Sequence, residues 1–462
     1  MIVMKFGGTS VEDAKAMSNV VALVGREKER PPIVVLSAVS GATNTLLASA
    51  RLAVDGKLED ALRLLNDLLE RHVTIAENLI DDRPAIQQLI FIFRRRIDEL
   101  KNLCQGIAIL GELTNRSLDA IACVGELLSS QILSEAIRLA GLPVAFVDAR
   151  TFMVTDDRFA GATPLLEQVG EKARSVLQPL VSAKTVVVTQ GFIGATTRGI
   201  TSTLGRGGSD YSASIIGAAL DAEEIQIWTD VDGVLTADPR IAPLARKLKV
   251  ISFREASELA YFGAKVLHPN TILPAVKKNI PVVVLNSRRP DSSGTRIVAS
   301  PTKAALAVKS VAAKKGITVI NIQSSRMLMA YGFLESIFSV FSRHATSVDL
   351  VSTSEVAVSL TIDNADHLEL IVPELERFAE VTIYEKKAIL CVVGDGINST
   401  AGVANRIFRA LGDVNAIMIS QGASENNMSI VIDEAQVVPA IQRLHKEFFE
   451  PMPASDLFEE GR

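Results

Sequence analysis

Short apolar runs alternate with longer amphipathic stretches through the first 285 residues of the chain. The apolar runs are rich in valine and isoleucine and are short enough to be buried strands. These predicted strands are residues 2–6, 32–37, 144–148, 184–191, 224–229 and 281–285. The stretches between them repeat apolar residues about every 3.6 positions, which is the period of a helix. The predicted helices are residues 11–27, 46–51, 59–79, 85–110, 118–140, 165–180, 211–220 and 253–261.

This alternation sets the expected fold class. Strands that alternate with helices predict an α/β domain with a mostly parallel sheet, covered by helices on both faces. In such a domain a ligand binds beyond the carboxyl ends of the strands. Gly7, Gly8 and Asp230 directly follow predicted strands, so they lie at ends of that kind.

The last third of the chain has a different pattern. Residues 286–300 are polar and turn-rich, which predicts a loop or linker. After it, residues 332–363 overlay residues 402–433 without a gap, and Ser354 and Glu355 meet an identical pair. Each copy reads as strand, glycine turn, helix, strand and strand. The repeat therefore predicts a small α+β module that is present twice.

Composition fits a soluble protein of several domains. The 462 residues predict about three domains at ~150 residues each. The net charge is −5 without a long basic run, which argues against a nucleic-acid or anionic-membrane surface. Cys104, Cys123 and Cys391 lack a CxxC spacing and read as reduced thiols. With no apolar run of ~18 residues and no signal-peptide layout, we expect a cytoplasmic protein.

Two glycine turns carry the candidate chemistry. Gly7 and Gly8 follow Lys5, and residues 205–210 place three glycines, Arg206 and an acid before a predicted helix. Glycine lets backbone N–H groups approach a ligand, and a helix N-terminus favours anions. The arginine fork suits a carboxylate or a phosphate. Either turn alone could be a plain surface turn, but together they predict a phosphate-binding site.

Several familiar motifs are absent or incomplete. The chain has no P-loop and no protein-kinase signature. Gly394 and Gly396 lack the third glycine of a dinucleotide fingerprint, and the acids around Asp232 lack the last ligand of a calcium loop. The five histidines show no metal-ligand spacing, so we expect structural roles for them and no dedicated metal site.

Several blocks of sequence resemble those of aspartate kinases, members of the amino acid kinase superfamily. The repeat is similar to the tandem ACT modules of the same enzymes, and the closest likeness is to the lysine-sensitive, monofunctional class. The blocks are VMKFGGTSV at 3–11, LSAVSGATN at 36–44, GEL at 125–127, TQGFIG at 189–194, LGRGGSDY at 204–211, WTDV at 228–231, ADPR at 237–240 and FGAKVLHP at 262–269.

The resemblance implies a fold and a reaction. The fold would be a three-layer αβα amino acid kinase domain at 1–296, followed by a regulatory domain at 301–462. Two ferredoxin-like ACT modules would occupy about 313–385 and about 386–450, with possible strand exchange from 301–312. The reaction would be ATP-dependent phosphorylation of L-aspartate to 4-phospho-L-aspartate, the first step of lysine, threonine and methionine biosynthesis.

The resemblance also implies roles for single residues. Lys5 would meet the transferring phosphoryl group and Asp210 would orient Lys5, since a carboxylate nucleophile has no proton to lose. Arg206 would pair with the aspartate α-carboxylate and Glu126 with its ammonium. Each has a plainer reading: a solvated lysine, a helix cap, a turn residue or a helix-surface glutamate. The other implied substrate contacts are Ser37, Thr43, Gly207 and Ser209.

The nucleotide and the effector would have their own residues. Mg²⁺ would accompany ATP and be held mainly by the phosphates, and Leu235 replaces a tyrosine of some relatives. The implied ATP contacts are Lys5, Gly7, Gly8, Thr229, Asp230, Asp238, Arg240 and Lys265. The implied effector pocket, with L-lysine as leading candidate, is Met327, Gly332, Phe333, Leu334, Ser347, Val348, Asp349, Thr353, Ser354 and Glu355.

Some alternatives stay open at this point. Ala330 replaces a serine of the lysine-sensitive class, so threonine or another effector is possible. Asn426 and Asn427 are expected at a subunit contact, because ACT modules of the family pair across subunits into a homodimer or higher oligomer. Another amino acid kinase, or an inactive amino-acid sensor, are the competing functions. We expect no attached homoserine dehydrogenase.

Overall fold

The computed structural model describes residues 1–262, 269–299, 308–324, 331–451 and 458. The chain forms two compact units. The first comprises Met1–Val234 and Val266–Ser300, and the second comprises Leu235–Lys265 and Pro301–Arg462. The segment that contains Asp238 and Arg240 therefore belongs to the same unit as the repeat.

A mostly parallel sheet is the centre of the first unit, with the strand order β3-β5-β2-β1-β8-β10-β11. Only β11 runs antiparallel to its neighbour in this series. Strands β1, β2, β5 and β10 are buried along their whole length, as expected when helices cover both faces. The strands are β1 (Ile2–Phe6), β2 (Ile33–Leu36), β3 (Val144–Phe146), β5 (Val186–Gln190), β8 (Glu224–Thr229), β10 (Val282–Asn286) and β11 (Thr295–Val298).

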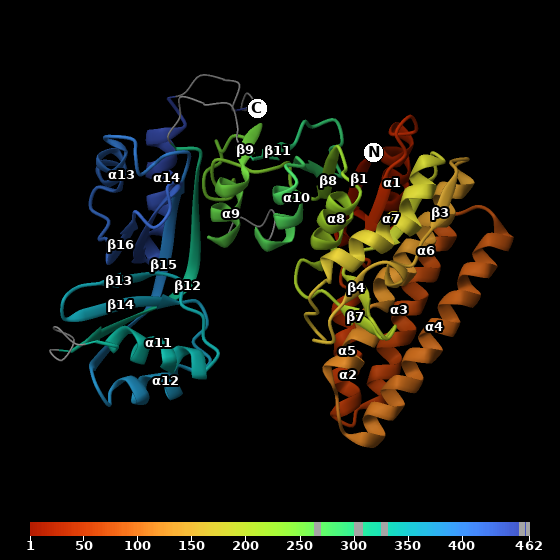
Figure 1. The fold of residues 1–462 in the computed structure, drawn as a ribbon, viewed down its shortest axis with the longest axis horizontal. Coiled ribbons are helices and arrows are strands. Elements are labelled where there is room, and N and C mark those ends of the chain that lie inside the picture. The colour runs from red at the N-terminus through yellow and green to blue at the C-terminus, as the bar shows by residue number, and fades with distance from the viewer. Residues whose placement is uncertain (263–268, 300–307, 325–330, 452–457, 459–462) are drawn as a thin grey trace. The chain divides into compact units, whose positions relative to one another are not determined.

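Helices pack on the sheet in two groups (Figure 1). Helix α6 contacts β2, β3 and β5 together with α1, α3 and α4, whereas α8 contacts β1 and β8 together with α7 and α10. The two groups thus lie on opposite faces and form the outer layers. The helices are α1 (Ala14–Arg26), α2 (Ala42–Val54), α3 (Leu58–Leu79), α4 (Arg83–Leu110), α5 (Asn115–Ala122), α6 (Val124–Leu139), α7 (Leu166–Ser182), α8 (Gly208–Ala219) and α10 (Leu273–Lys277).

A second, smaller sheet was not predicted. It contains β4 (Val154–Thr155), β6 (Ile193–Thr196) and β7 (Thr201–Thr203) in that order. These strands have two to four residues and are rich in threonine, so no apolar run announces them. Strand β7 leads directly into the glycine turn at 205–208, and the small sheet therefore positions that turn.

The second unit contains a six-stranded antiparallel sheet with the order β13-β14-β12-β15-β17-β16. The two copies of the repeat supply corresponding strands and one helix each, α11 and α13. The elements are β9 (Val250–Ser252), α9 (Phe253–Tyr261), β12 (Ser310–Gln323), α11 (Phe333–Arg343), β13 (Val351–Thr353), β14 (Ala357–Ile362), α12 (Leu368–Leu375), β15 (Glu380–Val393), α13 (Val403–Leu411), β16 (Met418–Gln421), β17 (Asn427–Asp433) and α14 (Val437–Phe448).

Two long strands join the copies of the repeat. Strands β12 and β15 have 14 residues each and pair with one another along most of their length. The first half of β12 lies beside the end of β15, where Val311 pairs with Val392, and β15 there pairs with β17 on its other side. The second half of β12 pairs with the first half of β15 on one side and with β14 on the other. Each long strand therefore contributes to both modules.

The predicted helices and strands are confirmed with local corrections. The helix expected at 118–140 is divided at Cys123 into α5 and α6, and the short helix at 46–51 extends over all of α2. Helix α8 begins at Gly208 rather than Tyr211, because Gly207 with φ 74° caps it from the left-handed region. Residues 115–139 have the length and mean hydropathy of a membrane span, but 78% of the apolar window is buried in the protein. This stretch is a core element.

Candidate active site

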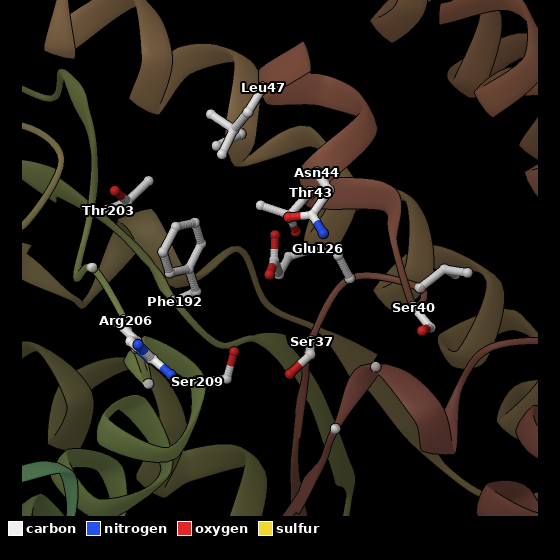
Figure 2. A pocket seen from close by; sticks show the side chains of 18 of the residues that line it. Ser37, Ser40, Thr43, Asn44, Leu47, Glu126, Phe192, Thr203, Arg206 and Ser209 are labelled. Atoms are coloured by element: carbon white, nitrogen blue, oxygen red, sulfur yellow. The ribbon is translucent and has the colours of Figure 1, made fainter. Parts of the chain in front are cut away.

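A cleft of about 830 Å³ opens in the first unit at the carboxyl ends of β1, β2 and β8. Parallel strands place these ends at one edge of the sheet, so segments distant in sequence meet there. Figure 2 shows Ser37, Glu126, Arg206 and Ser209 around this cleft. The predicted site residues that line it are Lys5, Gly7, Gly8, Ser37, Thr43, Glu126, Arg206, Gly207, Ser209, Asp210 and Thr229.

Lys5 and Asp210 form an ion pair at the bottom of the cleft. The Nζ–Oδ1 distance is 2.6 Å, and the two side chains are 10% and 16% exposed. Lys5 comes from β1 and Asp210 from the first turn of α8, which packs on that strand. An acid at a helix N-terminus is also favoured by the helix dipole. The pair therefore holds an ammonium group in a fixed position beside the cleft.

Glycine is required where the loops after β1 and β2 meet. A Cβ at Gly8 would lie 2.9 Å from the carbonyl oxygen of Ala38, closer than such atoms approach. The backbone N–H of Gly7 donates to the carbonyl of Trp228 at 3.0 Å. The Arg71 guanidinium on α3 donates a hydrogen bond to the carbonyl oxygen of Ser40 at 2.7 Å. These contacts bring both loops against Lys5 without large side chains between them.

The turn before α8 presents Arg206 to the cleft. Gly205 and Gly207 both have φ near +74°, a region that favours glycine. A Cβ at Gly208 would lie 2.8 Å from the ring of Phe192, so the helix start is packed closely. The Arg206 side chain is exposed and forms no ion pair with the described residues. Its guanidinium is available to an anion.

Glu126 is a buried carboxyl group that faces the cleft. It lies in the first turn of α6 and is 3% exposed, and its Oε2 atom has no hydrogen-bond partner among the described residues. Burial raises the pKa of Glu126 to about 8. A cationic group of a ligand would satisfy this oxygen and stabilise the ionised form. The alternative reading of Glu126 as a glutamate on the helix surface is wrong, because its side chain is buried.

The other predicted nucleotide contacts do not all lie in the cleft. Thr229 lines it and donates to its neighbour Asp230 at 3.2 Å. Asp238 and Arg240 belong to the second unit, where they form an ion pair with one another at 2.6 Å. Lys265 lies outside the described residues.

In the second unit, Asp349 is the most enclosed of the predicted effector residues. Its side chain is 3% exposed, and it accepts from the Tyr261 hydroxyl at 2.6 Å and from Lys314 at 3.2 Å. Its Oδ2 atom has no hydrogen-bond partner in the described part of the chain. Lys314 also pairs with Asp363 at 2.8 Å. The protein's own ammonium group thus already lies beside this acid.

The remaining effector residues that the structure describes lie at the start of α11, between α11 and β13, at the end of β13 and in the turn before β14. Gly332 caps α11 with φ 80°, and Phe333 packs edge-on against Phe378. Ser354 closes the turn by bonds to the backbone of Ala357. Met327 lies outside the described residues. Leu334, Ser347, Val348, Thr353 and Glu355 complete the predicted set in this unit.

Asn426 and Asn427, which the sequence places at a subunit contact, lie beside α9 in the second unit. Asn426 is 6% exposed, and the Asn427 amide donates to Glu258 on α9 of the same unit. Ser424 donates to the same carboxylate at 2.7 Å. The side chains of Asn427 and Ser424 thus hold α9 against the second copy of the repeat.

Sequence reasoning missed part of the cleft wall. Asp119, Phe192 and Thr203 line it, and so do Asn44 and Arg51 from α2. Asp119 lies within a predicted amphipathic helix, where an aspartate gives no local signal. Phe192 and Thr203 lie beside the small sheet that was not predicted.

Comparison with known proteins decides the family. The amino acid kinase family matches residues 1–286, and an ACT domain matches residues 390–448. The chain is 37% identical to aspartokinase 1, chloroplastic, of Arabidopsis thaliana, and covers 82% of its length. It is 36% identical to the lysine-sensitive aspartokinase 3 of Escherichia coli and covers 99% of that protein. The chain belongs to the aspartokinases.

Solved structures agree with this assignment. Escherichia coli aspartokinase III in complex with aspartate and ADP superposes with a TM-score of 0.84 at 35% identity, over 97% of this chain and all of the other. The same enzyme in complex with lysine and aspartate gives 0.82 at the same identity and coverage. This aspartokinase therefore has the amino acid kinase fold with an ACT region, and it phosphorylates aspartate with ATP. The competing readings, a kinase for another acid or an inactive sensor, are set aside.

Proposed function

We propose that Lys5 neutralises the phosphoryl group during its transfer from ATP to the side-chain carboxylate of aspartate, and that Asp210 holds Lys5 in place. Two anions must meet in this reaction, and phosphoryl transfer is catalysed mainly by positioning and charge stabilisation. The Lys5–Asp210 pair in the same cleft as Arg206 and Glu126 is the observation that carries the proposal.

Arg206 and Glu126 bind the two ends of the aspartate backbone in this proposal. The exposed guanidinium suits the α-carboxylate, and the buried carboxyl with a free oxygen suits the ammonium. Ser37, Thr43, Gly207 and Ser209 line the space between them. The carboxylate that reacts then points toward Lys5.

The nucleotide has its own proposed contacts. Gly7, Gly8 and Thr229 line the cleft. Gly8 offers its backbone N–H group to phosphate, because the N–H of Gly7 already donates to Trp228. Asp230, Asp238, Arg240 and Lys265 are proposed as further ATP contacts. Mg²⁺ is expected with the nucleotide, and no group of three or more acidic, histidine or cysteine side chains among the described residues is arranged to bind a metal. We assign its ligands mainly to the phosphates, because Mg²⁺ in such sites is bound by substrate phosphates and few protein ligands.

Lysine is the proposed effector, bound in the first ACT module. The free Oδ2 of Asp349 is a buried acceptor for an ammonium group, and the start of α11 offers N–H groups to a carboxylate. The structure of the related bacterial enzyme with lysine supports the choice of amino acid. The reaction would then be the first step of lysine, threonine and methionine biosynthesis, controlled by an end product.

The organisation of the enzyme completes the proposal. We assign residues 1–296 to catalysis and 301–462 to regulation, with modules at about 313–385 and about 386–450. The sheet of the second unit ends in β13 and β16, and such edge strands favour pairing with a second subunit. A homo-oligomer in the cytoplasm is therefore expected.

Initial rates with ATP and a panel of acceptors test the residue roles. Aspartate should be the best acceptor, and Arg206→Ala should raise KM for aspartate while KM for ATP changes little. Lysine, threonine and methionine are then titrated separately against the rate. An unchanged aspartate KM in the Arg206 variant would contradict the assigned substrate contact, and a flat lysine curve would contradict the effector.

A further inference from the structure

Asp119 is a buried acid for which the proposed chemistry has no use. It lies on α5, is 1% exposed and lines the cleft. No lysine, arginine or histidine pairs with it among the described residues. A buried carboxylate without a cation is costly unless hydrogen bonds stabilise it. The hydrogen-bond donors around Asp119 therefore indicate its role.

Both oxygens of Asp119 accept from two segments of chain. The N–H of Ala160 donates at 3.1 and 3.0 Å, and the N–H of Thr203 donates at 3.0 Å. The Thr203 hydroxyl donates at 2.6 Å. Burial raises the pKa of Asp119, while these hydrogen bonds act in the opposite direction. The carboxylate thus ties α5 to the loop at Ala160 and to the last residue of β7.

These two segments are the support of the glycine turn. Thr203 comes three residues before Arg206, and its carbonyl accepts from the N–H of Ala162 at 2.8 Å. A Cβ at Gly205 would lie 3.4 Å from the Cα of Gly161, so the turn rests directly on the loop. Ala160 has φ 66°, a strained value for a residue with a side chain, and the hydrogen bond that its N–H donates to Asp119 stabilises it.

Arg206 depends on this support. Its side chain has no ion pair in the described part of the protein, so the position of its guanidinium is set by the backbone that carries it. We infer that Asp119 is a positioning residue for aspartate binding: it fixes β7 and the adjoining loop, and thereby aims Arg206 at the α-carboxylate of the substrate. The inference rests on the proposed role of Arg206.

Replacement of Asp119 by asparagine tests this step. The amide has the same shape but only one acceptor oxygen, so its NH₂ group must face the N–H of Ala160 together with either the hydroxyl or the N–H of Thr203. A lost acceptor of this kind costs on the order of 1–3 kcal/mol, or about 5- to 150-fold in an equilibrium. We expect kcat/KM for aspartate to fall by about this factor through KM, with KM for ATP nearly unchanged.

Two competitive inhibitors separate positioning from general damage. Succinate keeps both carboxylates of aspartate but lacks the ammonium, and β-alanine keeps the ammonium but lacks the α-carboxylate. If Asp119 positions Arg206, Asp119→Asn raises the Ki of succinate by the same factor as the KM of aspartate. The Ki of β-alanine then stays within about twofold of its value in the natural protein. Equal weakening of both inhibitors, or of neither, would overturn the inference.

Three further variants keep the test decisive. Asp82→Asn is the matched control, because Asp82 also accepts from a backbone N–H, that of Ala85, but does not line the cleft. It should leave every kinetic constant unchanged. Thr203→Val removes only the hydroxyl and should show a smaller split between the inhibitors, which decides the question if Asp119→Asn does not fold. If Arg206→Ala leaves succinate and aspartate unaffected, the proposed substrate contact fails and the inference fails with it. If Arg206→Ala weakens both ligands but Asp119→Asn weakens neither, only the role of Asp119 fails.

Discussion

Each unit of the protein contains a buried pair of a lysine and a carboxylate, and the two pairs are built differently. Lys5 and Asp210 are 2.6 Å apart and line an open cleft, with side chains 10% and 16% exposed. Lys309 and Glu255 are 2.7 Å apart, with side chains 2% and 1% exposed. The second pair is sealed, whereas the first faces the space where substrates bind.

The surroundings of the carboxylates explain the difference. Glu255 also accepts from the backbone N–H of Ser252 at 2.7 Å and from its hydroxyl, so it forms a capping box at the start of α9. Asp210 has Lys5 as its charged partner and leaves the ammonium accessible. A sealed pair contributes to the conformation of a helix, and an accessible pair keeps a cation ready for an anionic ligand. Distance alone does not distinguish them.

Removal of Lys5 should have the largest effect. Lys5→Met eliminates the proposed charge on the transferring phosphoryl group, so turnover should fall by about 10³-fold or more. The melting temperature should change little, because the side chain faces the cleft. A coupled assay for ADP and a thermal scan measure the two quantities, and substantial residual turnover would argue against the catalytic role.

The sealed pair should respond in the opposite way. Lys309→Met leaves Glu255 buried without its cation, which should lower the free energy of unfolding of the second unit by about 3–5 kcal/mol. Hydrogen exchange at α9 and β12 measures this loss. The double variant with Glu255→Leu should recover part of it, because no unpaired charge remains. If the single variant were as stable as the natural protein, the pair would be dispensable.

Glu126 extends the comparison to a carboxyl without a lysine. Its pKa of about 8 reflects burial, and the substrate ammonium favours the ionised form. KM for aspartate should therefore fall as the pH rises from about 6.5 to 8, and Glu126→Gln should remove this dependence while raising KM by roughly 10- to 100-fold. A KM–pH profile that is the same in both proteins would exclude the contact.

The same shift has a consequence for stability. The folded protein holds the Glu126 proton more tightly than the unfolded chain does, so its free energy of unfolding decreases as the pH rises from about 4.5 to 8. Glu126→Gln should remove this contribution, and its melting temperature at neutral pH should exceed that of the natural protein. Thermal scans across the pH range measure the effect.

Asp349 and Lys314 form a pair of intermediate exposure, at 3% and 20%. Asp349→Ala removes the proposed acceptor for the effector ammonium, so the lysine concentration for half inhibition should rise about tenfold or more. Asp363→Asn is the control, because it removes the other partner of Lys314 and keeps Asp349. Equal sensitivity to lysine in the natural protein and the Asp349 variant would place the effector elsewhere.

The sequence predicted the parallel strands of the first unit well, because short valine-rich runs between helices are typical of buried strands. It also predicted Lys5, Arg206, Asp210 and Glu126 as site residues, since each lies in a motif with glycines beside it, and all four line one cleft. Asp119 could not be found in this way, because its partners lie 41 and 84 positions further along the chain. Its role arises only when α5 packs on β7, a strand of three residues that no periodicity indicates.

The partners of Asp349 illustrate the same limit. The acid was predicted from the resemblance, but Tyr261 and Lys314 lie 88 and 35 positions before it. Tyr261 ends α9, and its contact is visible only once the repeat has folded. Local pattern predicts elements and close motifs, and polar contacts between distant segments require the three-dimensional structure.

The length of β12 and β15 limits how the regulatory half can be taken apart. Each strand continues from one copy of the repeat into the other, so a gene fragment that encodes a single copy would leave half a strand with bare backbone amides and carbonyls. Such a fragment should aggregate or pair its exposed strand edge with another protein. Attempts to graft this sensor onto another enzyme should therefore transfer both copies as one indivisible cassette.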